Sequence, residues 1–167
     1  MTKEQEKWLN YALNLLSVKM RTEREMREKL EKKQVEATMI QLVLSYLKEK
    51  RFIDDSHYAK VYIESHQNRY GPYRLKQSLR QKGVTDEKIQ WAFEELEASL
   101  NPEVEAERIL KKKMDTLSID FDQVKSDYVY RRKMQNKLSQ FLAYRGFSID
   151  VIRHVVSRLL TEEFFDE

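Results

Sequence analysis

The stretch LRQKGV at residues 79–84 recurs in altered form as LEKKQV at residues 30–35 and as LAYRGF at residues 142–147. Each version begins with leucine, continues through a polar segment and closes on an apolar residue five positions later. Gly83 and Gly146 stand where a helix end favours a left-handed residue, a conformation that costs glycine nothing. Gln34 holds this position in the first version, so we expect a weaker cap there. The three stretches predict three equivalent joints between helices.

The apolar pattern continues in step on both sides of these joints. In each copy, an aliphatic residue stands four positions before the leucine. An isoleucine stands five positions after the closing apolar residue, and a further leucine follows it. These positions are Met26, Leu75 and Leu138; Ile40, Ile89 and Ile152; and Leu47, Leu96 and Leu159. The third copy is offset further from the second than the second is from the first, which predicts an insertion near DTLSIDFDQVKSD, residues 115–127.

Helix-capping residues frame the same segments. Thr22 and Glu25 have the spacing of a capping box, and Thr85 and Ser148 follow the joints as candidate N-caps. Both prolines come directly after a residue suited to end or cap a helix, in the pairs Gly71-Pro72 and Asn101-Pro102. Proline is tolerated at the first helical position because its missing N–H has no partner there in any case.

The sequence therefore predicts an all-α protein built from three tandem three-helix repeats. Strand signals are nearly absent, and the repeats are expected at residues 1–51, 52–100 and 101–167, with boundaries near KRFIDD and SLNP. The third would hold the early insertion and an acidic tail of Glu162, Glu163, Asp166 and Glu167. Arrays of this kind are elongated and curved, and commonly offer a concave surface to a partner.

Residue types that carry catalysis or bind metal are sparse. The chain has no cysteine, and its three glycines all fall at helix boundaries, which argues against thiolate chemistry and a phosphate-binding loop. His57, His66 and His154 lack metal-ligand spacing. Asp54 and Asp55 resemble an acidic pair at a helix N-terminus more than a hydrolytic or metal site with His57. We expect no enzyme activity, metal or cofactor.

We expect a monomer, and other features indicate a protein of the cytoplasm. The first residues, MTKEQEKWLNYALNLL, are too charged for a signal peptide. No apolar run reaches the roughly 18–20 residues of a membrane span. The absence of cysteine fits a reducing compartment.

Charge is sorted helix by helix. Residues 69–84 contain five cations and no acid, and a second acid-free basic run lies between residues 128 and 145. If the two repeats stack, their basic helices would form a stripe suited to a phosphate backbone or to an acidic protein groove. Interleaved tyrosines could stack on bases or pack at an interface. The candidate contact residues are Arg69, Tyr70, Arg74, Arg80, Lys82, Arg131, Arg132, Lys137 and Arg145.

The segment YGPYRLKQSLRQKGVTDEKIQWAFEEL at residues 70–96, together with FIDDSHYA at residues 52–59, resembles the RecX family, bacterial modulators of the RecA recombinase. The resemblance implies a row of three-helix repeats. It also implies binding in the groove of the RecA–single-stranded-DNA filament, limited filament extension, and lower ATPase, strand-exchange and co-protease activity. Family members have no catalytic site. Among the matching motif positions, Leu75, Leu79 and the Gly-Pro pair would be structural, whereas Arg74, with neighbouring Arg69, Tyr70 and Arg80, would contact the partner.

Two other functions fit the same residues. The basic stripe could bind single-stranded DNA directly, in which case binding should weaken steeply with salt. Alternatively, the chain could be a helical adaptor whose basic helices only face solvent. Charge reversal at Arg74 and Arg80 would then leave every interaction intact.

Overall fold

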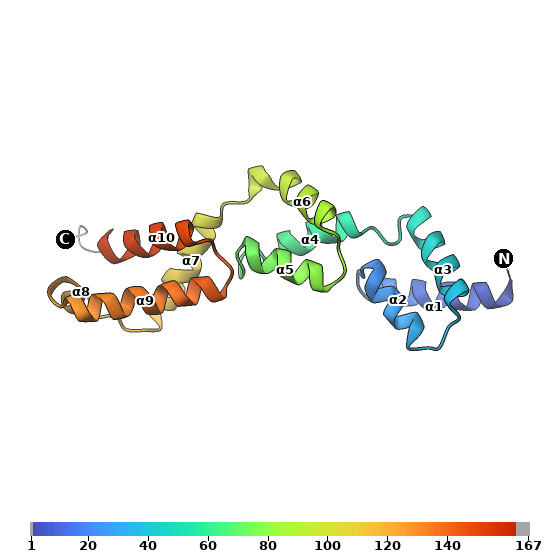
Figure 1. Cartoon of the computed structure of the whole chain (residues 1–167), viewed down its shortest axis with the longest axis horizontal. Coiled ribbons are helices and arrows are strands. Elements are labelled where there is room, and N and C mark those ends of the chain that lie inside the picture. The colour runs from blue at the N-terminus through green and yellow to red at the C-terminus, as the bar shows by residue number, and fades with distance from the viewer. Residues whose placement is uncertain (1, 163–167) are drawn as a thin grey trace. The chain divides into compact units, whose positions relative to one another are not determined.

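The computed structural model describes residues 2–162, which form ten α-helices, one short 3-10 helix and no strand (Figure 1). The all-α prediction is confirmed. The α-helices are α1 (Lys3–Val18), α2 (Glu23–Glu31), α3 (Ala37–Glu49), α4 (Asp55–His66), α5 (Pro72–Gln81), α6 (Asp86–Glu95), α7 (Pro102–Asp115), α8 (Phe121–Ser126), α9 (Tyr128–Tyr144) and α10 (Ile149–Glu162); the 3-10 helix η1 is Glu97–Ser99.

The helices follow the predicted threefold pattern, with one addition. Helices α1–α3 and α4–α6 form the first two triplets, and α7, α9 and α10 form the third. The additional helix α8 lies within the predicted insertion and packs on α9. Residues 163–167 of the predicted acidic tail lie outside the described residues, as does the Glu162 side chain. None of the described helices is both long and apolar enough to span a membrane.

The chain forms two compact units. Unit 1 contains the residues up to Ile63 together with Ser78–Leu96, and unit 2 contains Glu64–Gln77 together with the residues from Glu97 onward. Both α4 and α5 therefore contribute residues to each unit. The breaks between α3 and α4 and between α6 and α7 lie at the expected positions, but the division into three domains at residues 51 and 100 stays a prediction.

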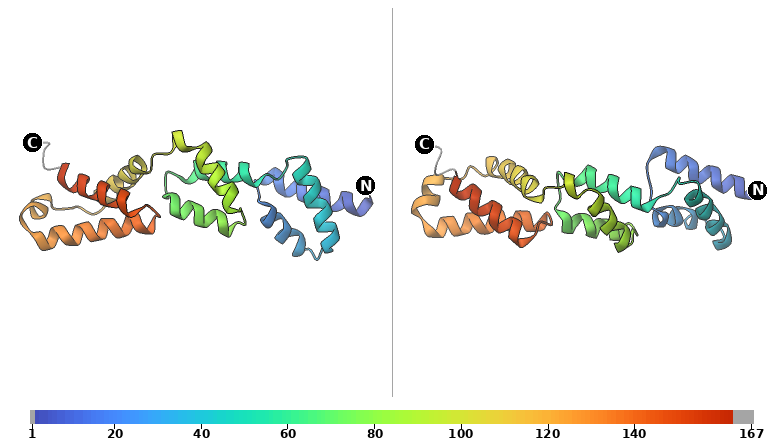
Figure 2. Two further views of the ribbon diagram at one scale, coloured as in Figure 1. Left: turned by 45° about the horizontal axis from the view of Figure 1, so that its top comes forward. Right: turned by 90° about the horizontal axis from the view of Figure 1, so that it is seen from above.

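Each unit has its own apolar core. In unit 1, α3 packs against α1 and α2, and in unit 2, α10 packs against α7 and α9 (Figures 1 and 2). The aliphatic residues that define the repeat are buried, and those of the first and third copies lie in these cores, with Met26, Leu30, Leu138 and Leu142 fully inaccessible. The repeat pattern therefore marks the residues that pack the helices together.

Most predicted helix ends are confirmed. Thr22 and Glu25 form the capping box, Asn101 accepts a hydrogen bond from the Val104 amide, and Ser148 accepts one from the Val151 amide. Thr85 occupies the N-cap position of α6, but the prediction that its side chain caps the helix is wrong. Its hydroxyl instead bonds to the Glu87 carboxylate.

The joints have the predicted left-handed backbone. Gly83 has φ +84° and Gly146 has φ +86°. Gln34 takes the same conformation, with φ 57°, although it carries a side chain. Its side chain is exposed.

Candidate partner-binding surface

In unit 2 the start of α5 docks on the joint between α9 and α10. The Gly71 N–H donates to the Arg145 carbonyl at 2.8 Å, and the Tyr73 N–H donates to the Gly146 carbonyl at 3.1 Å. Amides at the start of a helix lack a partner within the helix, so the joint carbonyls satisfy them. A Cβ on Gly71 would lie 2.4 Å from the Gly146 oxygen, which explains why glycine precedes Pro72.

This docking places Arg74 between two tyrosines. Its guanidinium lies 4.8 Å from the ring centre of Tyr70 and 4.8 Å from that of Tyr144. It also donates to the Tyr144 carbonyl at 2.9 Å. Planar stacking on two rings together with a hydrogen bond suits the guanidinium, and the ammonium of a lysine would not reproduce this combination. Arg74 therefore orders a surface on which the Tyr144 ring is largely exposed.

Arg69 and Arg145 lie beside this cluster. Arg145 donates to the Arg69 carbonyl at 3.0 Å, and its guanidinium lies 5.0 Å from the Phe141 ring and 5.9 Å from the Tyr70 ring. Four of the predicted contact residues, from segments far apart in the sequence, thus come together in unit 2. They are Arg69, Tyr70, Arg74 and Arg145.

The same corner contains three cations that the sequence analysis missed. Arg108, Lys112 and Lys113 of α7 line a groove of about 520 Å3 together with Arg69 and Arg145. Arg108 and Lys112 are four residues apart and so share one face of the helix, and Lys113 follows Lys112 at the groove. This periodicity was a usable signal, but α7 also carries acids, and no sequence feature places it beside Arg69.

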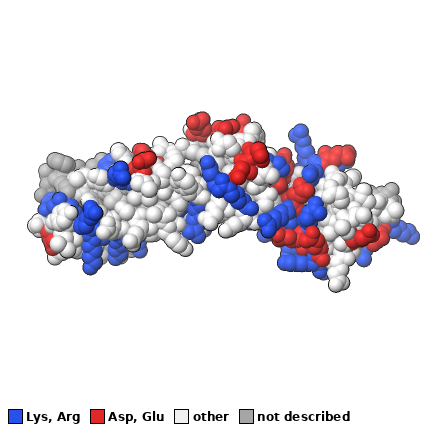
Figure 3. Space-filling model, in the orientation of Figure 1, with Lys and Arg blue, Asp and Glu red and all other residues white. Residues whose placement is uncertain are grey.

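The basic residues of α9 have two different roles. The Arg131 guanidinium donates to the carbonyls of Val124 and Lys125, each at 2.7 Å, and so caps the C-terminus of α8. Arg132 and Lys137 are exposed and, with Lys133, line an open surface of α9. Cations protrude along this margin of unit 2 in Figure 3, whereas cations and acids are intermixed over unit 1. Arg132 and Lys137 are accessible for a partner, whereas Arg131 is engaged internally.

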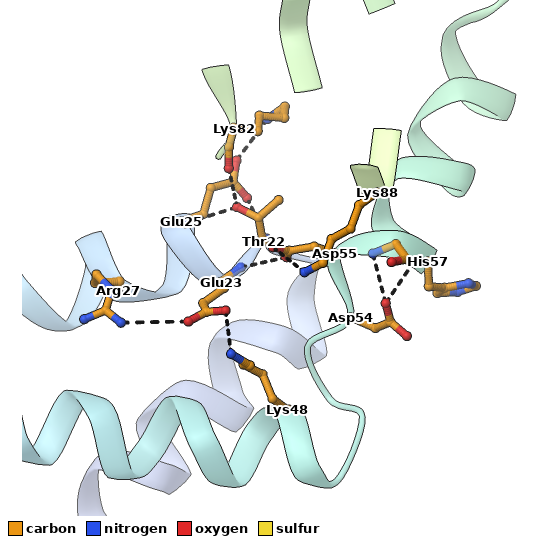
Figure 4. Close-up of polar contacts among 11 residues, drawn as sticks. Thr22, Glu23, Glu25, Arg27, Lys48, Asp54, Asp55, His57, Lys82 and Lys88 are labelled. Carbon is orange, nitrogen blue, oxygen red and sulfur yellow. Dashed lines mark hydrogen bonds and ion pairs between the residues drawn. The ribbon is translucent and has the colours of Figure 1, made fainter. Parts of the chain in front are cut away.

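The two remaining predicted residues belong to unit 1 and are both paired. The Arg80 guanidinium lies 2.6 Å from the Asp86 carboxylate, in an exposed ion pair. The Lys82 ammonium lies 2.9 Å from the Glu25 carboxylate (Figure 4). Burial disfavours the charged form of Lys82, but the hydrogen bond to Glu25 and the neighbouring Tyr58 outweigh it, so the pKa of Lys82 is raised. Burial, followed by the charge of Glu25, raises the pKa of Tyr58.

Unit 1 repeats the joint of unit 2. The Thr22 hydroxyl donates to the Lys82 carbonyl at 2.7 Å, so in both units an N-cap residue donates to the carbonyl that precedes a joint glycine. A Cβ on Gly83 would lie 2.5 Å from the Cβ of Arg24. Buried Asp55 completes the contact, since its carboxylate accepts the Glu23 N–H at 2.9 Å and lies 3.6 Å from the Lys88 ammonium (Figure 4).

The acidic pair at the start of α4 is structural, as expected. Asp54 accepts hydrogen bonds from the amides of Ser56 and His57 at 2.9 and 3.1 Å and thereby caps α4. The His57 side chain points away from both aspartates in Figure 4. Among the described residues, no group of three or more potential ligands could hold a metal ion.

Known proteins with similar sequence and structure identify the family. Residues 9–47, 54–92 and 105–156 match the family models for the first, second and third three-helix domains of RecX. The regulatory protein RecX of Clostridium acetobutylicum is 30% identical over 151 residues, which cover 90% of this chain and 68% of that protein. That of Leuconostoc mesenteroides is 31% identical over 158 residues, covering 93% of this chain and 55% of that protein.

The chain thus spans from about half to about two-thirds of the length of these curated relatives. The crystal structure of RecX from Lactobacillus salivarius matches with a TM-score of 0.79 and 28% identity, covering 95% of this chain and 98% of that one. Three tandem three-helix domains are therefore shown by the family models and by the structural match. The chain belongs to the RecX family of regulatory proteins.

Proposed function

We propose that this chain is a negative regulator of the RecA recombinase. It binds in the groove of the RecA–single-stranded-DNA filament, limits filament extension and lowers ATPase, strand-exchange and co-protease activity. It acts in the cytoplasm, in homologous recombination, DNA repair and the SOS response, and it has no catalytic site of its own. Membership in a family of regulatory proteins supports this role.

The observation that carries the proposal is the preorganised basic and aromatic surface of unit 2. Arg74 is fixed between Tyr70 and Tyr144, so the surface is ordered before a partner arrives. Prior order reduces the entropy lost on binding. Tyrosine and arginine are also the residues that most often dominate protein interfaces. Exposed Arg132 and Lys137 extend the positive charge along α9, which would steer the chain toward an acidic groove.

The test is DNA-dependent ATP hydrolysis by RecA with this chain added well below the concentration of RecA. A parallel reaction contains excess single-stranded DNA. Suppression that survives the excess DNA supports action on the filament. If suppression requires stoichiometric protein and disappears with excess DNA, the chain competes for DNA and the proposed mechanism is rejected.

Paired charge reversals identify the surface that is used. Arg132→Glu with Lys137→Glu alters the exposed acid-free face of α9, and we expect substantially weaker inhibition. Lys3→Glu with Lys7→Glu makes the same change in charge on exposed residues of α1, so it serves as the matched control. Equal loss of inhibition in both variants would show that net charge, and not this surface, controls binding.

A further inference from the structure

The outer face of α9 combines positive charge with exposed apolar groups. Tyr128 and Val129, the first two residues of the helix, are 70% and 74% exposed. Arg132 and Lys133 follow one turn later and are also exposed, and no acid is among the described residues that line this face. Adjoining apolar groups rimmed by polar ones mark an interaction site. This rim is cationic, so the complementary occupant is acidic as well as apolar.

A segment of that chemistry follows α10 directly. Residues 163–167, EFFDE, hold two phenylalanines and three acids. The phenylalanine rings can bury apolar area on Tyr128 and Val129, where pairs of aromatic rings are favourable. The carboxylates can pair with Arg132 and Lys133. Both the charge and the apolar content of the segment therefore match the outer face of α9.

Helix α10 ends close to this face. It runs back along α9 after the short joint, and its last turn lies at the same end of unit 2 as the start of α9 (Figures 1 and 2). The 14 residues of α10 span about 21 Å, and the same length measured back along α9 from Tyr144 ends near Arg131. Five further residues extend up to about 17 Å, whereas packed helices lie about 8–10 Å apart. Segment 163–167 is thus long enough to cross onto α9.

The end of α7 is a second basic region within reach, but it lacks the apolar groups. Contacts of Glu103 with His154 and of Glu107 with Arg158 show that α7 runs parallel to α10. Counting four residues onward in both helices places Lys111 level with the end of α10. The apolar residues in the last two turns of α7 are buried. This end of α7 offers charge alone, so the phenylalanines favour α9.

We propose that residues 163–167 fold back over the first turns of α9, with the phenylalanines on Tyr128 and Val129 and the acids facing Arg132 and Lys133. A short connection gives an effective concentration of about 1 mM. A contact with a Kd of about 0.1 mM between separate molecules would then be closed about ten times as often as open. Because Arg132 belongs to the surface used in the proposed function, the segment acts as an autoinhibitory cover, a role that rests on that function.

Disulfide trapping in the full chain measures the contact, since the sequence has no cysteine of its own. One variant combines Asp166→Cys with Asn136→Cys, because Asn136 is exposed on the outer face of α9. The matched control combines Asp166→Cys with Lys111→Cys, because Lys111 is also exposed and lies level with the end of α10. Under mild oxidation the first pair should form an intramolecular disulfide about tenfold faster than the control pair, as mass spectrometry of the peptides would show.

The apolar contact is tested in the same assay. Adding Phe164→Ser and Phe165→Ser should abolish the difference between the two cysteine pairs. Equal rates with the phenylalanines in place would overturn the proposal, and so would faster trapping at Lys111, which would place the segment on α7. A difference that survives the serine substitutions, or a disulfide that forms only between two molecules, would reject it as well.

Inhibition of RecA ATP hydrolysis then tests the covering role. The oxidised Asp166→Cys, Asn136→Cys chain is compared with the same sample after reduction, and the locked form should require a severalfold higher concentration. Equal inhibition by both forms would reject the autoinhibitory role. If neither form inhibits while trapping remains selective, the proposed function fails and the folding back stands, so the two failures are distinguishable.

Discussion

Replacing Gly146 with alanine tests whether the joint in unit 2 is as tight as its geometry indicates. A left-handed backbone costs a residue with a Cβ about 1–2 kcal/mol, and Gly146 has φ +86°. The new Cβ would also lie 2.5 Å from the Arg74 backbone nitrogen and Cβ. Overpacking adds about 1–3 kcal/mol, so we expect Gly146→Ala to lower the free energy of unfolding by roughly 2–5 kcal/mol.

Urea unfolding followed by circular dichroism measures this loss. With a slope of about 2 kcal/mol per M urea, a loss of about 3 kcal/mol moves the transition midpoint by about 1.5 M. Trp8 and Trp91 both belong to unit 1. Tryptophan fluorescence should therefore shift less than circular dichroism in Gly146→Ala.

Gln34→Gly supplies the comparison, because Gln34 has the same left-handed backbone with an exposed side chain. Gln34→Gly removes the cost of a left-handed backbone, whereas Gly146→Ala introduces that cost, and Gln34→Gly involves no clash with a neighbouring helix. It should therefore raise the free energy of unfolding by up to about 1 kcal/mol. The excess loss in Gly146→Ala over this gain measures the contact with Arg74. If there is no excess, the tight docking of α5 on the joint is refuted.

Three other substitutions test contacts described above. Thr22→Val should cost about 1–3 kcal/mol in tryptophan-monitored urea unfolding, since it removes a cap and leaves the Lys82 carbonyl unpaired, whereas Thr22→Ser should cost much less. Because the pKa of Lys82 is raised in the folded state, charged Lys82 stabilises the fold fully below the unfolded pKa of about 10.4, and this contribution is lost as the pH rises through the folded pKa. Glu25→Gln should therefore flatten the fall in stability above about pH 10. An unchanged pH profile would contradict the pairing of Lys82 with Glu25. Arg131→Met should speed hydrogen exchange in α8 by on the order of tenfold, for a loss of about 1–2 kcal/mol, while exposed Arg132→Met should leave it unchanged.

Local signals predicted the repeat because they act within a few residues. Glycine at positions 83 and 146 indicates a left-handed backbone by itself, and the capping box of Thr22 and Glu25 involves residues of a single helix turn. Thr85 shows the limit of such signals. A carboxylate two residues away, on Glu87, competes for the same hydroxyl, and propensity alone does not decide between two nearby acceptors.

The binding surface was less predictable because it depends on how helices rotate against each other. Arg131 and Arg132 are neighbours with the same charge, yet one caps α8 and the other faces solvent. The sequence identified Arg69, Arg74 and Arg145 as separate cations but contained no local sign that they meet. It missed Lys112 and Lys113 because a mixed-charge helix looks like an ordinary solvated one until its neighbours are known.

The joints also determine where such a protein could be lengthened. In both units the second helix of a preceding repeat inserts its N-cap against a following joint, and glycine provides the space. The joint at Gln34 follows the same backbone path but carries a side chain where an incoming helix would lie. A designer who wished to dock a further helix on this joint would therefore change Gln34 to glycine first, because glycine leaves that space free.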